Sequence, residues 1–187
     1  MRKMYSAFLF CILSIPLFSI DADGKYFKEL SGEAIIHVQS RMILQKKTEY
    51  FELTKTVIFD KSGENVGIGF NSSKIDLVGS VFIYNYPKKD IADQLNGCIS
   101  YYNSNTKKLS VIDAVQFELP NDKKTKAVFS VVKYNDTYKK TKNSMLYTYI
   151  LIMDRGQWYC KVEITSPESE QDKMNNMLEK IVELINI

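Results

Sequence analysis

The chain has 187 residues, of which 45% are hydrophobic and 25% are charged, and its formal net charge is +3. The length suits one domain of ordinary size, and the composition is that of a globular protein, which argues against a disordered chain or a membrane channel. A charge so close to neutral disfavours nucleic acid as the main partner.

The first 22 residues have the pattern of a secretory signal peptide. Arg2 and Lys3 form a positively charged start, an apolar run follows, and no acidic residue precedes Asp21. We therefore expect residues 1–22 to be a signal peptide and residues 23–187 to be a single domain that is periplasmic or secreted. The alternative is a retained N-terminal anchor, and membrane association is expected only in that case.

Cleavage after residue 22 leaves 23 basic and 21 acidic residues, a formal charge of +2. Arg41 and Arg155 are then the only arginines. Proteins that read nucleic acid usually rely on arginine, so no nucleic-acid partner is expected.

The segment before residue 48 carries the weakest structural pattern. Apolar residues fall roughly on one side of a helix over Gly32–Leu44, but a strand over Ala34–Val38 would explain them as well. The helix is the preferred prediction for this segment.

Alternating apolar residues predict strands over Tyr50–Asp60, Asn65–Phe70 and Ile75–Tyr86. In the second strand, Gly67 and Gly69 leave one face without side chains. Either a ligand or another backbone approaches there, or a bulge or an aromatic side chain covers the glycines. The second explanation is preferred.

Pro87 ends the third strand and is expected to start a helix, because proline is favoured in the first helical turn. The apolar residues that follow lie at helical spacing and predict one buried stripe: Ile91, Leu95, Cys98, Ile99 and Tyr102. Strands are predicted next over Leu109–Leu119 and Thr125–Tyr134, with a turn at residues 120–122 between them. A polar loop is predicted over Asn135–Asn143.

The last 44 residues predict a hairpin followed by a helix. Its strands are Ser144–Asp154 and Gln157–Thr165, and Ser166 and Pro167 open a long amphipathic helix that would lie across the hairpin. Strands and helices do not alternate regularly along the chain. The predicted fold class is therefore α+β, with an antiparallel β-sheet, packed helices and a C-terminal amphipathic helix.

The order of elements from Val66 onward resembles that of uncharacterised exported bacterial proteins with a PsbP-like fold. The resemblance rests on Val66–Phe70, Ser80–Tyr84, the helix after Pro87, and Gly156–Val162 leading into Thr165-Ser166-Pro167. Its motifs are structural: a turn glycine, a core tryptophan and a helix-starting proline. The resemblance implies an antiparallel sheet with helices packed on it, and an accessory or binding role with no catalytic residue to carry over.

Two cysteines, Cys98 and Cys160, would remain in the exported protein. An even pair in an exported protein is compatible with a disulfide, which would contribute about 3–4 kcal/mol in the chain-entropy model. The alternative is two buried free thiols that never approach each other. No histidine partner is visible for a catalytic thiol.

His37 is the only histidine, and no partner lies at the spacing that a metal site requires. We expect a structural or surface role for it. No catalytic residue, metal site or cofactor is predicted from the sequence.

Four lysines crowd the region of the predicted polar loop: Lys133, Lys139, Lys140 and Lys142. They could contact an anionic surface such as lipid headgroups. The preferred interpretation is a solvated loop.

The leading hypothesis is a non-enzymatic exported accessory or binding protein of the periplasm or envelope, with an unidentified protein or small molecule as its partner. If the protein has a ligand site, it is expected where Gly67 and Gly69 thin the sheet, or between the sheet and the helix over Pro87–Tyr102. Two alternatives stay open. One is a small secreted hydrolase or toxin with a site built from distant residues, and the other is a partner-binding module such as an immunity protein or chaperone.

Overall fold

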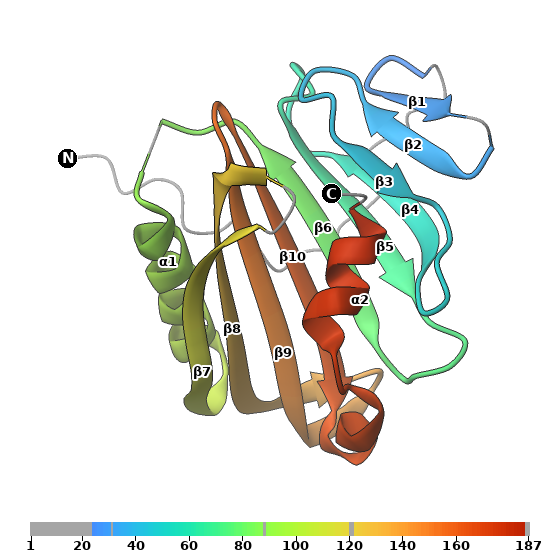
Figure 1. The fold of residues 1–187 in the computed structure, drawn as a ribbon. Helices are drawn as coiled ribbons and strands as arrows, with labels where there is room; N and C mark the ends of the chain where they lie inside the picture. Colours follow the sequence, from blue (N-terminus) through green and yellow to red (C-terminus); the bar gives the residue numbers. More distant parts are fainter. Residues whose placement is uncertain (1–23, 31, 88, 120–121, 186–187) are drawn as a thin grey trace.

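A computed structural model describes residues 24–30, 32–87, 89–119 and 122–185 (Figure 1). The predicted signal peptide and most of the predicted turn at residues 120–122 lie outside the described residues. Within the described ranges, no helix is both long enough and apolar enough to cross a membrane.

The first described elements are three short strands, β1 (Phe27–Leu30), β2 (Ala34–His37) and β3 (Ile43–Gln45), which form an antiparallel sheet in that order. The helix predicted over residues 32–44 is therefore wrong, and the alternative strand is correct. Gly32 and Arg41 have φ angles of 78° and 62°. These left-handed turns at both ends of β2 reverse the chain and prevent a continuous helix.

The main sheet has seven antiparallel strands in the order β4-β5-β6-β10-β9-β8-β7. Their bounds are β4 (Glu52–Ile58), β5 (Asn65–Asn71), β6 (Val78–Tyr84), β7 (Lys107–Leu119), β8 (Asp122–Tyr138), β9 (Thr141–Arg155) and β10 (Trp158–Pro167). The predicted α+β class with antiparallel strands is confirmed.

The polar loop predicted over residues 135–143 is mostly strand. β8 continues to Tyr138, and β9 begins at Thr141. Lys139 and Lys140 form the tight turn between them with φ angles of 42° and 78°. Pairing with the neighbouring strand, such as Asn135 with Met145, satisfies the backbone and so overrides the polar composition.

Helix α1 (Ile91–Asn105) follows β6, and Asp90 caps it by accepting a 2.8 Å hydrogen bond from the Ala92 backbone N–H. Pro87 therefore precedes the helix and does not lie in its first turn. The predicted stripe is confirmed for four of its five residues, which are buried: Ile91, Leu95, Cys98 and Tyr102.

The single long helix predicted after Pro167 is wrong. A 3-10 turn, η1 (Glu168–Lys173), is followed by a short helix, α2 (Met177–Leu184). Asn176, with a φ angle of 57°, separates the two. A left-handed residue breaks the run of helical hydrogen bonds, so the apolar residues at helical spacing are divided between two pieces.

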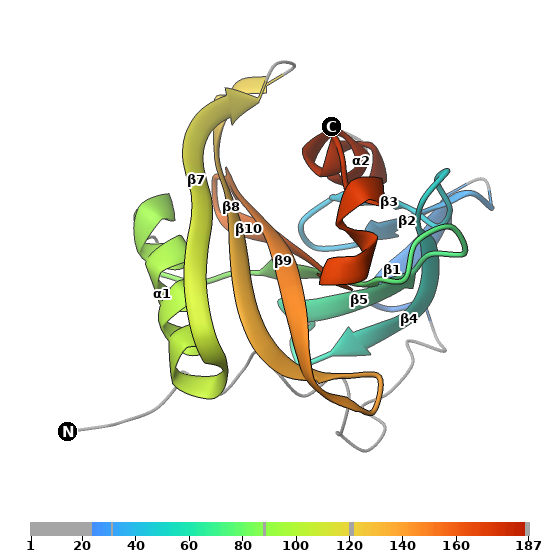
Figure 2. The ribbon, with the colours of Figure 1, turned by 90° about the horizontal axis from the view of Figure 1, so that it is seen from below.

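The curved sheet separates two hydrophobic cores, with α2 inside the curve and α1 on the outer face (Figure 2). β9 shows the division, because Leu151 belongs to the core beneath α2 whereas Ile150 and Ile152 belong to the core beneath α1. Successive side chains of a strand point to opposite faces. Both faces of the central strands are therefore covered.

Candidate functional site

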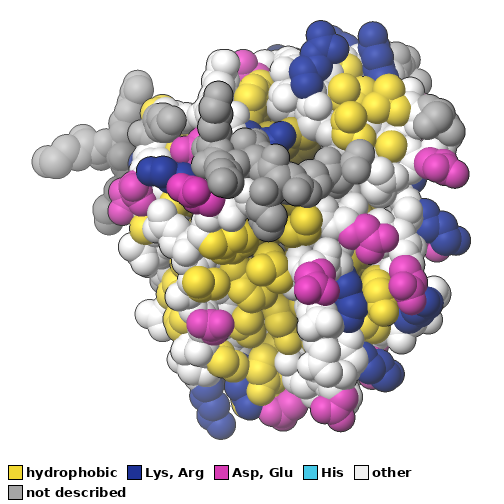
Figure 3. Space-filling model, in the orientation of Figure 1, with side chains coloured by type: hydrophobic (Ala, Val, Ile, Leu, Met, Phe, Trp, Pro, Cys, Tyr) yellow, Lys and Arg dark blue, Asp and Glu magenta, His cyan; other side chains and the backbone are white. Residues whose placement is uncertain are grey.

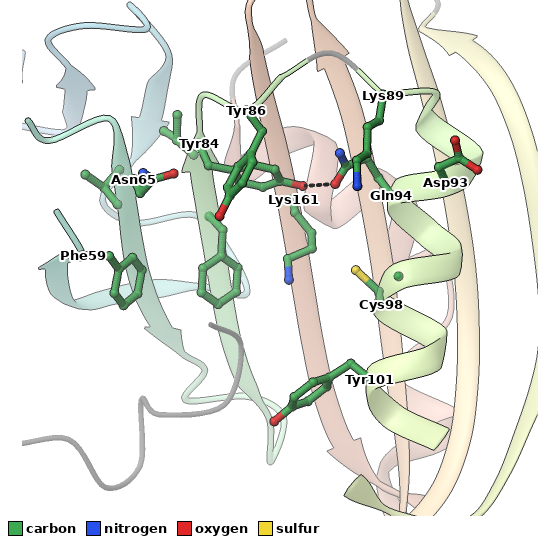
Figure 4. A pocket seen from close by; sticks show the side chains of 14 residues that line it. Phe59, Asn65, Tyr84, Tyr86, Lys89, Asp93, Gln94, Cys98, Tyr101 and Lys161 are labelled. Carbon is green, nitrogen blue, oxygen red and sulfur yellow. Dashed lines mark hydrogen bonds between the residues drawn. The ribbon is translucent and has the colours of Figure 1, made fainter. Parts of the chain in front are cut away.

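A pocket of about 430 Å³ lies between α1 and the outer face of β5, β6 and β10 (Figure 4). Five aromatic residues line it: Phe59, Phe82, Tyr84, Tyr86 and Tyr101. The polar residues of its wall are Asn65, Lys89, Asp93, Gln94, Cys98 and Lys161. This is one of the two places where the sequence predicted that a ligand site would lie.

Strand alternation and one helical glycine create this pocket. Phe82 and Tyr84 are two residues apart on β6, so both point toward α1. On the helix side, a Cβ atom added at Gly97 would meet nothing within 4 Å. The pocket is therefore lined by aromatic rings on the sheet side and, at Gly97, by a helix position that carries no side chain.

Two aromatic rings of the wall, Phe82 and Tyr84, each lie nearly parallel to a neighbouring ring. The centroids of Phe59 and Phe82 are 6.3 Å apart at an interplanar angle of 22°, and those of Tyr84 and Tyr159 are 5.5 Å apart at 25°. Tyr86 stands at 76° to Tyr84 and is 43% exposed. The wall thus presents ring surfaces that suit an apolar or aromatic ligand.

Lys161 lies at the floor of the pocket and forms a buried ion pair with Glu163, which does not itself line the pocket. Lys161 Nζ donates a 3.0 Å hydrogen bond to Glu163 Oε1, and the two side chains are 1% and 9% exposed. The ammonium also lies 4.4 Å from the centroid of the Phe82 ring. Alternating positions on β10 place both residues on the outer face. A charged pair this deep in an apolar core is costly unless its geometry is good, so its presence under a pocket makes a functional role worth testing.

Asn65 supplies a polar atom without a described partner. Its Nδ2 donates a hydrogen bond to Asp60 Oδ2, which fixes the amide orientation. Its Oδ1 is buried and accepts no hydrogen bond from the described residues, and Figure 4 shows it directed toward Tyr84. On the helix side, Gln94 Oε1 accepts a 3.4 Å hydrogen bond from Tyr84 Oη.

Gly67 and Gly69 are covered by side chains of β4 and of the turn after it. A Cβ at Gly67 would lie 3.0 Å from the Phe59 ring, and one at Gly69 would lie 3.0 Å from Thr54 Oγ1. The register of β4 shifts between Leu53 and Lys55. The preferred explanation, a bulge or an aromatic cover, is confirmed at both glycines.

The possible disulfide is not formed: Cys98 and Cys160 are both free thiols, as in the alternative of two buried thiols that never approach each other. Cys98 belongs to the core beneath α1, whereas Cys160 belongs to the core beneath α2 on the other side of the sheet. Burial raises the pKa of Cys98 to about 11 and that of Cys160 to about 12. Little thiolate is present at neutral pH, so neither is set up as a nucleophile.

His37 is fully buried and does not line the pocket. Its Nε2 lies 2.9 Å from the Gly63 carbonyl oxygen and its Nδ1 lies 2.8 Å from Ser40 Oγ. Its ring packs against Phe27 and Trp158. These contacts tie the small sheet to the main one. No cluster of metal-ligating side chains occurs among the described residues.

The four predicted lysines lie at and near the β8–β9 turn. Lys133 pairs with Glu168 at 2.7 Å, and Lys139 pairs with Asp76 at 2.5 Å. On the face seen in Figure 3, basic and acidic side chains are mixed. Contact of these lysines with an anionic surface, the less favoured interpretation, stays untested, and two of the four already pair with carboxylates.

Lys161, Glu163 and Asn65 are not among the residues predicted from the sequence. A usable pattern existed for the first two, because charged residues at alternate positions of an otherwise apolar strand share one face. No local pattern marks Asn65, which becomes important only where β5 meets the residues around α1.

No protein-family model matches the sequence, and no curated protein matches it significantly. A protein of unknown function from Pseudomonas aeruginosa is similar in structure, with 9% identity and a TM-score of 0.46 over 83% of this chain and 92% of that one. The cyanobacterial PsbP of Synechocystis sp. PCC 6803 is similar with 10% identity and a TM-score of 0.43, over 74% of this chain and 92% of that one. At these scores neither similarity brings a family or a function to this chain.

Proposed function

We propose that this protein is a non-enzymatic, exported binding protein whose ligand is a small, mainly apolar molecule. The observation that carries the proposal is the aromatic-lined pocket of about 430 Å³ between α1 and the sheet. Ligand pockets of proteins usually measure about 300–1,000 Å³ and combine apolar walls with a few polar groups. The pocket has both properties.

The polar groups of the pocket favour binding over chemistry. The Cys98 thiol has a raised pKa, and the Lys161 amine already donates to Glu163. A nucleophile or a general base needs a free, activated group within reach of the substrate. The same groups suit recognition, because they are held in place by their surroundings.

Export is supported by the charged start and apolar run of residues 1–22. The full chain, expressed in a bacterium, is expected in the periplasmic fraction with a mass reduced by a segment of that size. Full-length protein recovered only from the cytosol would contradict export and leave the pocket proposal standing.

Binding in the pocket is tested by calorimetry with 2-naphthol, a neutral aromatic probe. Gly97→Trp places a large ring at the open helix position, and Ser100→Trp is the matched control because Ser100 is exposed on the same helix and does not line the pocket. We expect Gly97→Trp to weaken binding at least about tenfold, or about 1.4 kcal/mol, and the control to bind as the wild type does. Absence of binding to the wild type, or equal loss in both variants, would refute the proposal.

A further inference from the structure

We propose that the pocket selects neutral, planar aromatic ligands against both anions and cations, and that the balanced charges of Lys161 and Glu163 set this selectivity. The inference rests on the proposed function and names the class of ligand that the same pocket takes. It follows from the shape of the walls and from the charges at the floor.

The shape favours a flat ligand. The sheet side of the pocket carries the nearly parallel rings of Phe59 and Phe82, and the opposite side is α1 at Gly97, where no side chain fills the space. In Figure 4, Tyr86 and Tyr101 lie toward two ends of this space. A cavity of about 150 Å³ holds benzene, so about 430 Å³ holds a fused bicyclic ring. Stacked or edge-to-face contacts with the aromatic walls would stabilise such a ring.

The charges at the floor disfavour an ionic ligand of either sign. Lys161 and Glu163 form a neutral pair, and the exposed Lys89 and Asp93 of the wall also carry opposite charges. An anion would gain an attraction to Lys161 but meet repulsion from Glu163, and a cation would meet the reverse. A charged group that leaves water without a net partner pays its full desolvation cost.

The influence of both floor charges extends into the pocket wall. Burial is the main cause of the raised pKa of the Cys98 thiol; of the smaller effects, Lys161 lowers this pKa and Glu163 raises it. The two floor charges therefore oppose each other at a residue that lines the pocket. A bound group near Cys98 would experience the same opposition.

Asn65 favours a neutral ligand that carries a hydrogen-bond donor. Its buried Oδ1 accepts no hydrogen bond from the described residues, and an unpaired buried acceptor costs about 1–3 kcal/mol. A ligand hydroxyl or N–H group that reaches this oxygen would supply the partner. An anionic oxygen in the same place would repel it.

Three naphthalene probes of similar size test the selectivity by calorimetry at pH 7. They are 2-naphthol, which is neutral, 2-naphthoate, which is an anion, and 2-naphthylmethylamine, which is a cation. The wild type is expected to bind 2-naphthol at least about tenfold more tightly than either charged probe, a difference of about 1.4 kcal/mol.

Two substitutions shift the balance in opposite directions. Glu163→Gln is close in shape and leaves the ammonium without a counter-charge, so the ratio of naphthoate to naphthol affinity should rise about tenfold or more. Lys161→Gln leaves the carboxylate without a counter-charge, so the ratio of naphthylmethylamine to naphthol affinity should rise. Opposite shifts separate a charge effect from general damage, and circular dichroism verifies that each variant is folded. Should a variant not fold, the preference of the wild type among the three probes decides the matter.

The outcomes separate this inference from the proposed function. If no probe binds the wild type, the pocket is not a ligand site and both proposals fall. If all three probes bind the wild type equally, or a charged probe binds most tightly, the selectivity is refuted while ligand binding stands. If folded variants bind with unchanged ratios, Lys161 and Glu163 do not set the selectivity.

Discussion

Lys161 Nζ and Glu163 Oε1 lie 3.0 Å apart, and the two side chains are 1% and 9% exposed. Two residues of one strand thus place opposite charges in the apolar layer between the sheet and α1. Replacing one partner leaves the other charge buried and alone, which typically costs about 3–5 kcal/mol. Lys161→Met is therefore expected to lower the free energy of unfolding by that amount in urea titrations.

The double variant Lys161→Met with Glu163→Leu removes both charges and restores an apolar layer. It should recover most of the lost stability, because paired buried charges often contribute no more than apolar residues of similar size. A double variant as unstable as the single one would show that the pair itself, and not an orphaned charge, stabilises the fold.

His37 is expected to make stability depend on pH. Burial is the largest effect on its pKa and holds it below the ordinary value of 6.5. As the pH falls below about 6.5, the unfolded chain binds a proton before the folded protein does. The free energy of unfolding therefore decreases as the pH falls from about 6.5 to the pKa of His37 in the folded protein. The decrease is at most about 1.4 kcal/mol per pH unit. An asparagine does not ionise, so the unfolding free energy of the His37→Asn variant should no longer decrease between pH 7 and 5.5. An unchanged pH dependence would show that another group causes it.

Gly67 and Gly97 should respond in opposite ways to alanine. At Gly67 the new Cβ would lie 3.0 Å from the Phe59 ring, and forcing that ring aside should cost about 1–3 kcal/mol. Gly97 lies within α1, and a Cβ added there meets open space. Alanine should therefore stabilise the protein by about 0.5–1 kcal/mol through its higher helix propensity. Thermal unfolding of the two variants measures both effects, and destabilisation by Gly97→Ala would contradict the open space at that position.

The thiols of Cys98 and Cys160 should be hidden in the native protein and free after unfolding. Both are buried, and their raised pKa values leave little thiolate at pH 8. In a Cys11→Ser variant, an aromatic disulfide reagent should react slowly without denaturant and titrate two thiols in guanidinium without reductant. No reaction in guanidinium would reveal a disulfide, and fast reaction of one native thiol would contradict its burial.

Patterns over a few residues predicted the main sheet and α1 well. Asn65–Phe70 alternates with period two, and the stripe that includes Cys98 repeats with the helical period, so each segment carries its own evidence for the element it forms. The segments that failed depend on partners elsewhere in the chain. Residues 135–143 are polar yet pair with β9, and residues 32–44 bear a helix-like spacing but are bent by left-handed turns.

The sequence by itself determined that Lys161 and Glu163 share one strand face, because side chains two positions apart on a strand point the same way. Only the tertiary structure decided that Phe59 and Asn65 line the same pocket as Lys161, which follows them by about a hundred residues in the sequence. Contacts between distant segments depend on sheet order and curvature, and the sequence near each residue holds no record of either.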